Sequence, residues 1–244
     1  MFVVCGKIYK HLKELGRKMK NKIKVKELIK KYYRNVIILV VGVSFMALGG
    51  AMLVSANYGS DALMVFNQGV ATFLNIKVGI AIMITNLLVL IVIIFVNRKS
   101  IGLGTIAIAF LLGPLVDMIL QANILPTPIT FWGSALTLAL AFLAGTFGIS
   151  LYMFANVGLS PFEGILIAIK EKKNWRFAYI KIVNDAFFFT IGWLLGGVFG
   201  IASIITVFIY GPLIDFFTKL FTKMNLFKLP KSQEKVLPEA EKNG

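Results

Sequence analysis

The chain has 244 residues, of which 58% are hydrophobic and only 15% are charged, and its mean hydropathy is +0.82. Soluble domains carry roughly 25% charged residues, so this composition excludes a soluble globular protein and predicts an all-α integral membrane protein. The formal charge is +15, and residues 1–35 hold twelve Lys or Arg against two Glu, a net charge of +10. Such a segment beside a hydrophobic span sets topology and contacts anionic lipid, and we expect no nucleic-acid partner.

Residues 7–33 are predicted to form a helix on the membrane surface, because apolar residues recur there at helical spacing with lysines between them. These apolar residues are Ile8, Leu12, Leu15, Met19 and Ile23. We therefore assign residues 1–35 as a basic amphipathic cytoplasmic tail whose partner is anionic lipid. Cys5 is the only cysteine, so no internal disulfide can form.

Six segments are predicted to cross the bilayer, which needs about 20 residues each. They are residues 36–56, 78–96, 101–121, 131–155, 177–199 and 200–217. Residues 60–74 and 160–170 are too short to cross, and we expect them to form re-entrant or interfacial helices. The basic loops at 97–99 and 170–176 and the basic segment from Lys219 onward all face the cytoplasm if six spans place both termini there.

One pattern of small and polar residues occurs twice, about a hundred residues apart. The first copy has Gly49, Asn57, Gly59, Asp61, Lys77, Asn86, Gly102, Thr105, Gly113, Pro114 and Asp117. The second has Gly148, Asn156, Gly158, Ser160, Arg176, Asp185, Gly200, Ser203, Gly211, Pro212 and Asp215, with one residue deleted before Gly200. Three spans per copy are an odd number, so the second copy enters from the opposite side and the repeats are inverted.

The chain is thus expected to consist of five parts. Repeat 1 is residues 36–121 and repeat 2 is residues 131–219, each with three transmembrane helices and one short helix. Residues 122–130 link the two repeats. The tail 1–35 precedes repeat 1, and a cytoplasmic tail, residues 220–244, follows repeat 2. Gly49, Gly145 and Gly148 lie at helical spacing, which predicts close packing of helices.

Polar residues in the middle of spans are candidates for ligand or ion binding, because a charge at bilayer depth costs about 2.5–3.5 kcal/mol. Asn86 lies in the middle of its span, and Asn184 and Asp185 lie at the matching place of the second copy. Lys181 precedes Asp185 by one helical turn, so an ion pair on one face is the alternative to a binding role.

Asp117 and Asp215 each follow a Gly-Pro pair by three residues. Such breaks at matching places of two halves point to a site. The alternative, which we favour, is a kink near a helix end with the carboxylate reaching water at the membrane surface.

The segments at Asn57 and Asn156 each close a span and open a short helix. Asn and Gly favour turns, and Asp61 and Ser160 are suited to cap the helices that follow. The helix N-termini are also suited to hold an anionic group. Glu163 would oppose an anion there, and it is expected either to cap the second short helix or to receive a cation.

The residues also exclude some chemistry. His11 is the only histidine and lies in the basic tail, which excludes a histidine-based zinc site or a serine–histidine dyad in the membrane. No Gly-rich phosphate loop followed by Lys and Ser or Thr is present, which excludes ATP hydrolysis by that route. We expect no enzymatic activity, no cofactor and no metal site.

Several runs resemble one family. They are Asn156-Val-Gly-Leu-Ser-Pro-Phe-Glu-Gly164, Gly192-Trp-Leu-Leu-Gly-Gly-Val-Phe-Gly-Ile-Ala-Ser203 and Tyr210-Gly-Pro-Leu-Ile-Asp215, with Asn57–Asp61, Gly102-Leu-Gly-Thr105 and Gly113-Pro-Leu-Val-Asp117 in the first copy. Over about residues 36–219 the chain resembles the YczE/YitT-like family of bacterial membrane proteins, whose activity is unassigned. The resemblance implies a fold and a location in the cytoplasmic membrane of a bacterium, and no catalytic residues. The chain departs from the family in its basic N-terminus.

We expect a small secondary transporter or permease in which the two repeats alternate access to a site near the midplane. Asn86, Asn184 and Asp185 would line this site for a small molecule or ion, and Asp185 would carry a coupling proton. The alternatives are a substrate-binding subunit of an ATP-driven importer and a non-transporting membrane accessory or scaffold protein.

Overall fold

The computed structural model describes residues 33–96, 101–125, 131–155, 157–173, 175 and 177–223. The chain forms two compact units, Met1–Ile37 and Ile38–Gly244, and all contacts given below lie within the second unit. The amphipathic helix predicted at 7–33 lies outside the described residues except for Tyr33, as does most of the tail beyond residue 219.

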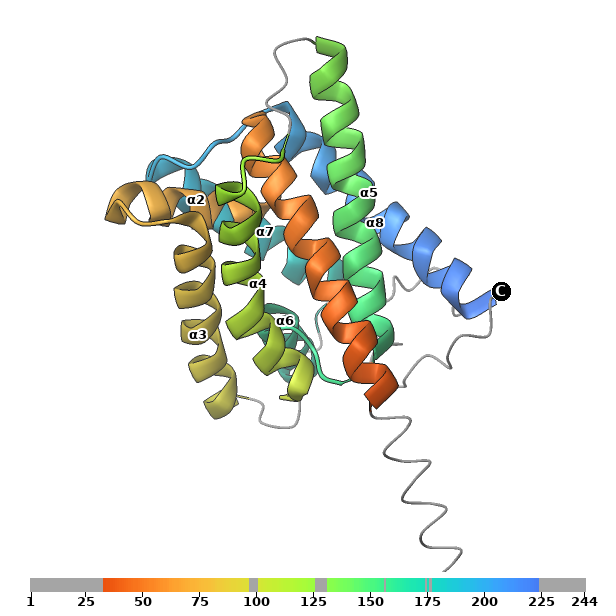
Figure 1. Ribbon diagram of the computed structural model, residues 1–244. Helices are drawn as coiled ribbons and strands as arrows, with labels where there is room; N and C mark the ends of the chain where they lie inside the picture. The colour runs from red at the N-terminus through yellow and green to blue at the C-terminus, as the bar shows by residue number, and fades with distance from the viewer. Residues whose placement is uncertain are drawn as a thin grey trace, which may run out of the picture. The chain divides into compact units, whose positions relative to one another are not determined.

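Every regular element of the described residues is a helix. A first helix, Tyr33–Ala56, precedes α2 (Ala62–Leu74), α3 (Val78–Val96), α4 (Leu103–Gln121), α5 (Phe131–Ala155), α6 (Pro161–Lys173), α7 (Phe177–Leu194) and α8 (Ile201–Lys223) (Figure 1). The bounds of α3 and α5 agree with the predicted spans. Helix α8 continues beyond its predicted end at residue 217, because the apolar run extends through Leu220 and Phe221.

Five helices of the described residues are long and apolar enough to cross a membrane, namely the first helix, α3, α4, α5 and α8. Helix α7, which we predicted to be a further span, is not among them, and its sequence contains Lys181, Asn184 and Asp185. The count of six spans therefore stays a prediction, whereas two short helices are present at the two predicted places, as α2 and α6.

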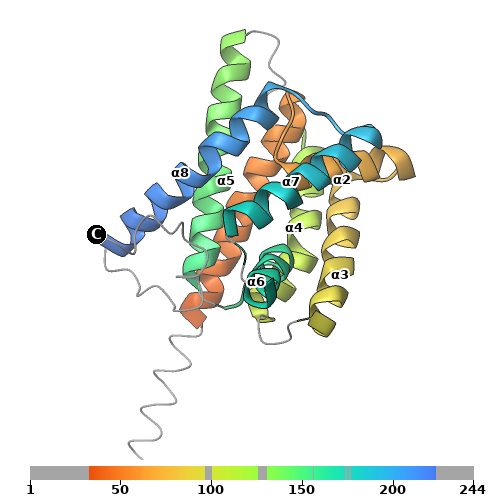
Figure 2. The same cartoon turned by 180° about the vertical axis from the view of Figure 1, so that it is seen from behind.

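Some pairs of packed helices lie within one sequence copy, and others join the two copies. Helix α3 lies along α4, and α8 crosses α5 obliquely, whereas α2 packs against α7 and α6 contacts both α3 and α7 (Figures 1 and 2). Each short helix thus contacts the second long helix of the opposite copy. Helix α2 also lies across the direction of α3 and α4 rather than along it (Figure 1).

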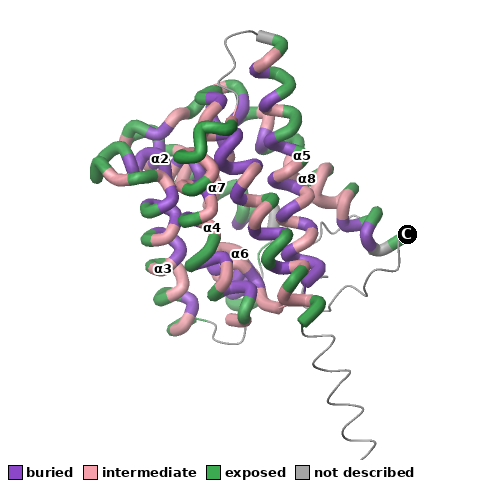
Figure 3. The backbone as a smooth tube through the Cα atoms, viewed as in Figure 1, coloured by how far each residue is buried: buried purple, intermediate pink, exposed green. Residues whose placement is uncertain are grey.

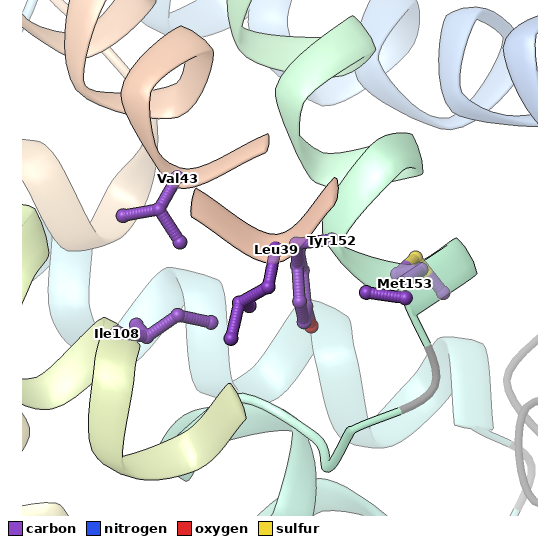
Figure 4. Packing of buried hydrophobic residues seen from close by; sticks show 6 residues of the cluster. Leu39, Val43, Ile108, Tyr152 and Met153 are labelled. Atoms are coloured by element: carbon purple, nitrogen blue, oxygen red, sulfur yellow. The ribbon is translucent and has the colours of Figure 1, made fainter. Parts of the chain in front are cut away.

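A buried apolar core joins the first helix, α4 and α5. It contains Leu39, Val43, Ile108, Tyr152 and Met153 (Figure 4). Outside the core, long stretches of the helices are exposed (Figure 3), and their exposed side chains include Phe95, Trp132 and Phe208 at 80%, 81% and 72%. Apolar side chains exposed over so many helices suit contact with lipid rather than water.

Glycines let the first helix and α5 approach each other closely. A Cβ atom at Gly49 would lie 2.5 Å from the backbone nitrogen of Gly145, and one at Gly148 would lie 2.4 Å from that of Met46. A larger residue at either position would force the helices apart. The close packing predicted for these glycines is confirmed.

Candidate functional site

Two turns, one at the start of each short helix, make matching contacts with the opposite copy. We call residues 57–61 and 157–160 the crossed turns. The carbonyl oxygen of Tyr58 accepts a hydrogen bond from Ala202 N at 3.0 Å, and that of Val157 accepts one from Gly104 N at 2.7 Å. These two bonds join equivalent positions of the repeated pattern, with the two copies exchanged.

Two hydroxyl groups complete the crossed turns. Ser203 Oγ accepts a hydrogen bond from Ser60 N at 3.1 Å, and Thr105 Oγ1 donates one to the carbonyl oxygen of Leu159 at 2.6 Å. Both hydroxyls are buried. The sequence repeat contains Thr105 and Ser203, but sequence analysis assigned them no role, because the partner of each lies in the other copy.

Glycine is needed where the crossed turns touch the opposite copy. Gly59 and Gly158 have φ of +95° and +124°, which side chains with a Cβ rarely adopt. A Cβ at Gly59 would also lie 2.6 Å from Gly200 N, and one at Gly158 would lie 2.7 Å from Gly102 Cα. The turn predicted at Asn57 is confirmed by its φ of 58°, while Asn156 lies outside the described residues.

The residues predicted to cap the short helices do so. Asp61 accepts a hydrogen bond from Met64 N at 3.0 Å at the start of α2. At the start of α6, Glu163 N donates to Ser160 Oγ at 3.2 Å and Ser160 N donates to Glu163 Oε2 at 3.3 Å, with Pro161 in the first helical position. This reciprocal pair is a capping box, which satisfies donors that a helix start leaves unpaired.

Glu163 has a second partner in the core. The hydroxyl of Tyr152 on α5 donates a hydrogen bond to Glu163 Oε2. Tyr152 is fully buried, and Figure 4 shows its ring beside Leu39. The tyrosine thus links the acidic start of α6 to the apolar core, a link that sequence analysis missed, although a tyrosine inside an apolar span is a recognisable signal.

One face of α7 carries an ion pair. Lys181 Nζ contacts Asp185 Oδ2 at 2.8 Å, and Asn184 Nδ2 donates to Asp185 Oδ1 at 3.4 Å. The ion pair left open as an alternative is therefore confirmed. On the same face, the ring of Phe188 lies 5.0 Å from that of Phe66 on α2 and 5.4 Å from that of Phe162 on α6.

Four charged side chains, on α7 and at the starts of α2 and α6, interact electrostatically. Asp61 interacts electrostatically with Asp185 and Lys181, and Glu163 interacts with Lys181. We call Asp61, Glu163, Lys181 and Asp185 the acidic cluster. Tyr210 on α8 also interacts electrostatically with Asp61. The cluster therefore combines residues of both sequence copies, which the sequence alone did not bring together.

Burial makes two carboxyls of the acidic cluster weak acids. Burial raises the pKa of Glu163 to about 7, against the lowering effects of the Ser160 N–H and of Lys181. Burial also raises the pKa of Asp61, and Asp185 raises it further, while the Met64 N–H and Lys181 lower it. Glu163 is thus placed to take up or release a proton near neutral pH.

Three further predicted site residues lie on α3, α4 and α8. Asn86 is buried in α3, which packs against α2, α4 and α6 rather than along α7. Asp117 Oδ1 accepts a hydrogen bond from Gly79 N at 2.7 Å and so supports the start of α3. Asp215 is half-buried in α8. Among the described residues, no three His, Cys, Asp or Glu are arranged to hold a metal ion.

These features define a helical protein that crosses the membrane several times. The chain belongs to a family of unknown function (DUF6198), whose model matches residues 33–219. It is similar to an uncharacterized protein of Haemophilus influenzae, with 24% identity over 79% of this chain and 87% of the relative. It is also similar to the uncharacterized membrane protein YczE of Bacillus subtilis, with 25% identity over 76% of this chain and 82% of that relative. The resemblance inferred from the sequence is confirmed. No solved structure matches the chain.

Proposed function

We propose that this protein is a small secondary transporter of the bacterial cytoplasmic membrane, driven by protonation of the acidic cluster. The observation that carries the proposal is the ion pair of Lys181 and Asp185 together with the electrostatic interactions of Asp61 and Glu163 with Lys181, which involve elements of both copies. Three carboxyls and one ammonium group carry a net charge that depends on how many protons are bound. Uptake of a proton near neutral pH therefore changes the attraction between α7 and the two short helices.

The exchanged contacts of the crossed turns support inverted repeats. The hydrogen bond from Ala202 N to Tyr58 O and the one from Gly104 N to Val157 O join equivalent positions, with donor and acceptor exchanged between the two copies. A two-fold relation of this kind is how many secondary transporters are built, and their substrate sites lie at the seam between the repeats. The acidic cluster lies at such a seam, and a rocking motion of one repeat against the other is the corresponding mechanism.

Charge sets the proposed orientation, with both termini in the cytoplasm and six crossings. A topology test starts from a Cys5→Ser variant, since Cys5 is the only native cysteine. A single cysteine at Lys99 is expected to resist an impermeant maleimide added outside the cell, and one at Thr127 is expected to react. The reverse labelling would reject the orientation.

The central test is a proton-driven signal from purified protein in liposomes. Rapid acidification on a solid-supported membrane is expected to give a transient current that Glu163→Gln and Asp61→Asn abolish. Asn still caps a helix start, so Asp61→Asn tests charge rather than folding. Glu171→Gln is the matched control, because Glu171 lies on the same helix at an exposed position. Equal currents from all variants would reject a role for the acidic cluster.

The same preparation separates the alternatives. A subunit of an ATP-driven importer is expected to co-purify with a cytoplasmic ATPase and to be inactive alone. A non-transporting accessory protein is expected to give no current, and its cellular phenotype is expected to survive Glu163→Gln. The proposed activity needs neither a cofactor nor a catalytic residue.

A further inference from the structure

The two halves differ in how their last two helices pack. In the first half α3 and α4 lie side by side (Figure 1), and a Cβ at Gly113 would lie 2.2 Å from the carbonyl oxygen of Gly79. In the second half α7 packs against α2, and α8 crosses α5 (Figure 2). Within residues 177–223, which the structure describes, no comparable packing joins α7 to α8.

The surfaces that would join α7 to α8 are exposed. Gly211 on α8 occupies the position of Gly113, and a Cβ there would meet no atom within 4 Å. Ile182 on α7 occupies the position of Met83, whose backbone nitrogen would lie 3.1 Å from a Cβ at Gly113. Ile182 is 64% exposed, whereas Met83 is half-buried. The contact that Gly113 makes between α4 and α3 in the first half therefore has no equivalent at Gly211 between α8 and α7 in the second half.

We infer that α7 has a second docking position on α8, in which Ile182 packs against Gly211 as Met83 packs against Gly113. The occupant of the exposed face of α8 is thus a segment of the same chain. This inference rests on the proposed function, since the second position supplies the other state of an alternating transporter. Docking on α8 would carry Lys181 and Asp185 away from Asp61, so the protonation state of the acidic cluster would govern the movement.

The sequence explains why α7 is found on α2 in this structure. Gly192 lets α7 approach the backbone of α2, since a Cβ there would lie 2.6 Å from Phe66 N. Ala178 stands where the first half has Gly79, and a Cβ at Gly79 would lie 2.1 Å from the Gly113 carbonyl oxygen. Alanine in place of glycine at this position of the sequence is therefore expected to weaken the proposed second position without abolishing it.

The test is a disulfide that only the second position allows. In the full chain with Cys5→Ser, Ile182→Cys is combined with Gly211→Cys, and membranes are oxidised with copper–phenanthroline. Both substitutions are at exposed positions, so the fold tolerates them. Free thiols are counted with maleimide mass tags after denaturation, and non-reducing gels separate disulfides within a chain from those between copies.

The control pair is Ile182→Cys with Ile209→Cys, which lies about 200° around α8 from residue 211. We expect the Gly211 pair to lose both thiols within one chain, the Ile209 pair to keep them, and added Ala178→Gly to speed the loss. Equal rates for the two pairs, or disulfides only between copies, would overturn the inference. The readout needs no substrate, so cross-linking without a proton-driven current would reject the proposed function while keeping the second position.

Discussion

Ser203 on α8 accepts a hydrogen bond from the backbone N–H of Ser60 at 3.1 Å, across 143 positions of the sequence. Ser203 is completely buried, and so is Ser60. The equivalent hydroxyl, that of Thr105, bonds the equivalent turn of the other copy. The two halves are therefore tied together twice, by buried bonds that no water replaces if they are lost.

Removing either hydroxyl is expected to destabilise the protein. Ser203→Ala leaves the buried Ser60 N–H without this acceptor, and Thr105→Val removes the donor to Leu159, each at a cost of about 1–3 kcal/mol. Chemical unfolding in detergent measures the loss. Ser44→Ala is the control, because its exposed hydroxyl bonds only a carbonyl of its own helix. Similar stability of all three variants would contradict the importance of the crossed turns.

Two equivalent glycines are expected to respond differently to alanine. Gly113→Ala places a methyl group 2.2 Å from the Gly79 carbonyl oxygen, and such overpacking costs about 1–3 kcal/mol. Gly211→Ala meets no atom within 4 Å, and alanine in a helix is favoured over glycine by up to about 1 kcal/mol. Thermal unfolding of the two variants side by side measures the difference. Equal losses would show that α7 already covers Gly211.

Stability is expected to depend on pH through Glu163. Its pKa is about 7 in the folded protein and 4.5 ordinarily, so the folded state holds the proton more tightly. Its contribution to stability is fully present below about pH 4.5 and is lost as the pH rises through about 7. We expect the unfolding temperature to fall over this range and Glu163→Gln to flatten the profile. If Glu163→Gln left the pH dependence of the unfolding temperature unchanged while Glu171→Gln altered it, the titrating group would not be Glu163.

Asp117 is expected to matter for the start of α3 rather than for transport. Asp117→Ala leaves the Gly79 N–H without its acceptor, which costs about 1–3 kcal/mol, whereas Asp117→Asn keeps an acceptor and costs less. Unfolding in detergent and the proton-driven current are measured on the same samples. Loss of current in Asp117→Asn at normal stability would instead restore the binding role that its Gly-Pro neighbour suggested.

Much of the local structure was predictable because it depends on neighbouring residues. The turn at Asn57, the cap at Asp61 and the capping box of Ser160 and Glu163 follow from residues within one helical turn of each other. The spacing of Lys181 and Asp185 already placed both on one face of a helix. The sequence left undecided only whether they pair with each other or whether Asp185 binds a ligand. The ends of α3 and α5 were set by hydropathy.

The composition of the site was not predictable, because it depends on packing between distant segments. Equivalent positions in the two copies suggested that Asn86 and Asp185 line one site, which stays a prediction: Asn86 is buried in α3, which packs against α2, α4 and α6, and Asp185 pairs with Lys181 on α7. Glu163 meets Tyr152 and Lys181 only once α5, α6 and α7 are in place. The repeat identifies equivalent residues, and equivalent residues of two inverted halves need not touch.

The charged face of α7 also bears on how the protein is made. A helix that contains Lys181 and Asp185 is costly to release into lipid alone, and α7 packs against α2, which is synthesised much earlier. We expect the insertion machinery to hold α7 back until the first half has folded around it. Chains that lack residues 1–74, and with them Asp61 and α2, should therefore leave α7 accessible to a protease, and quality control in the cell would remove them.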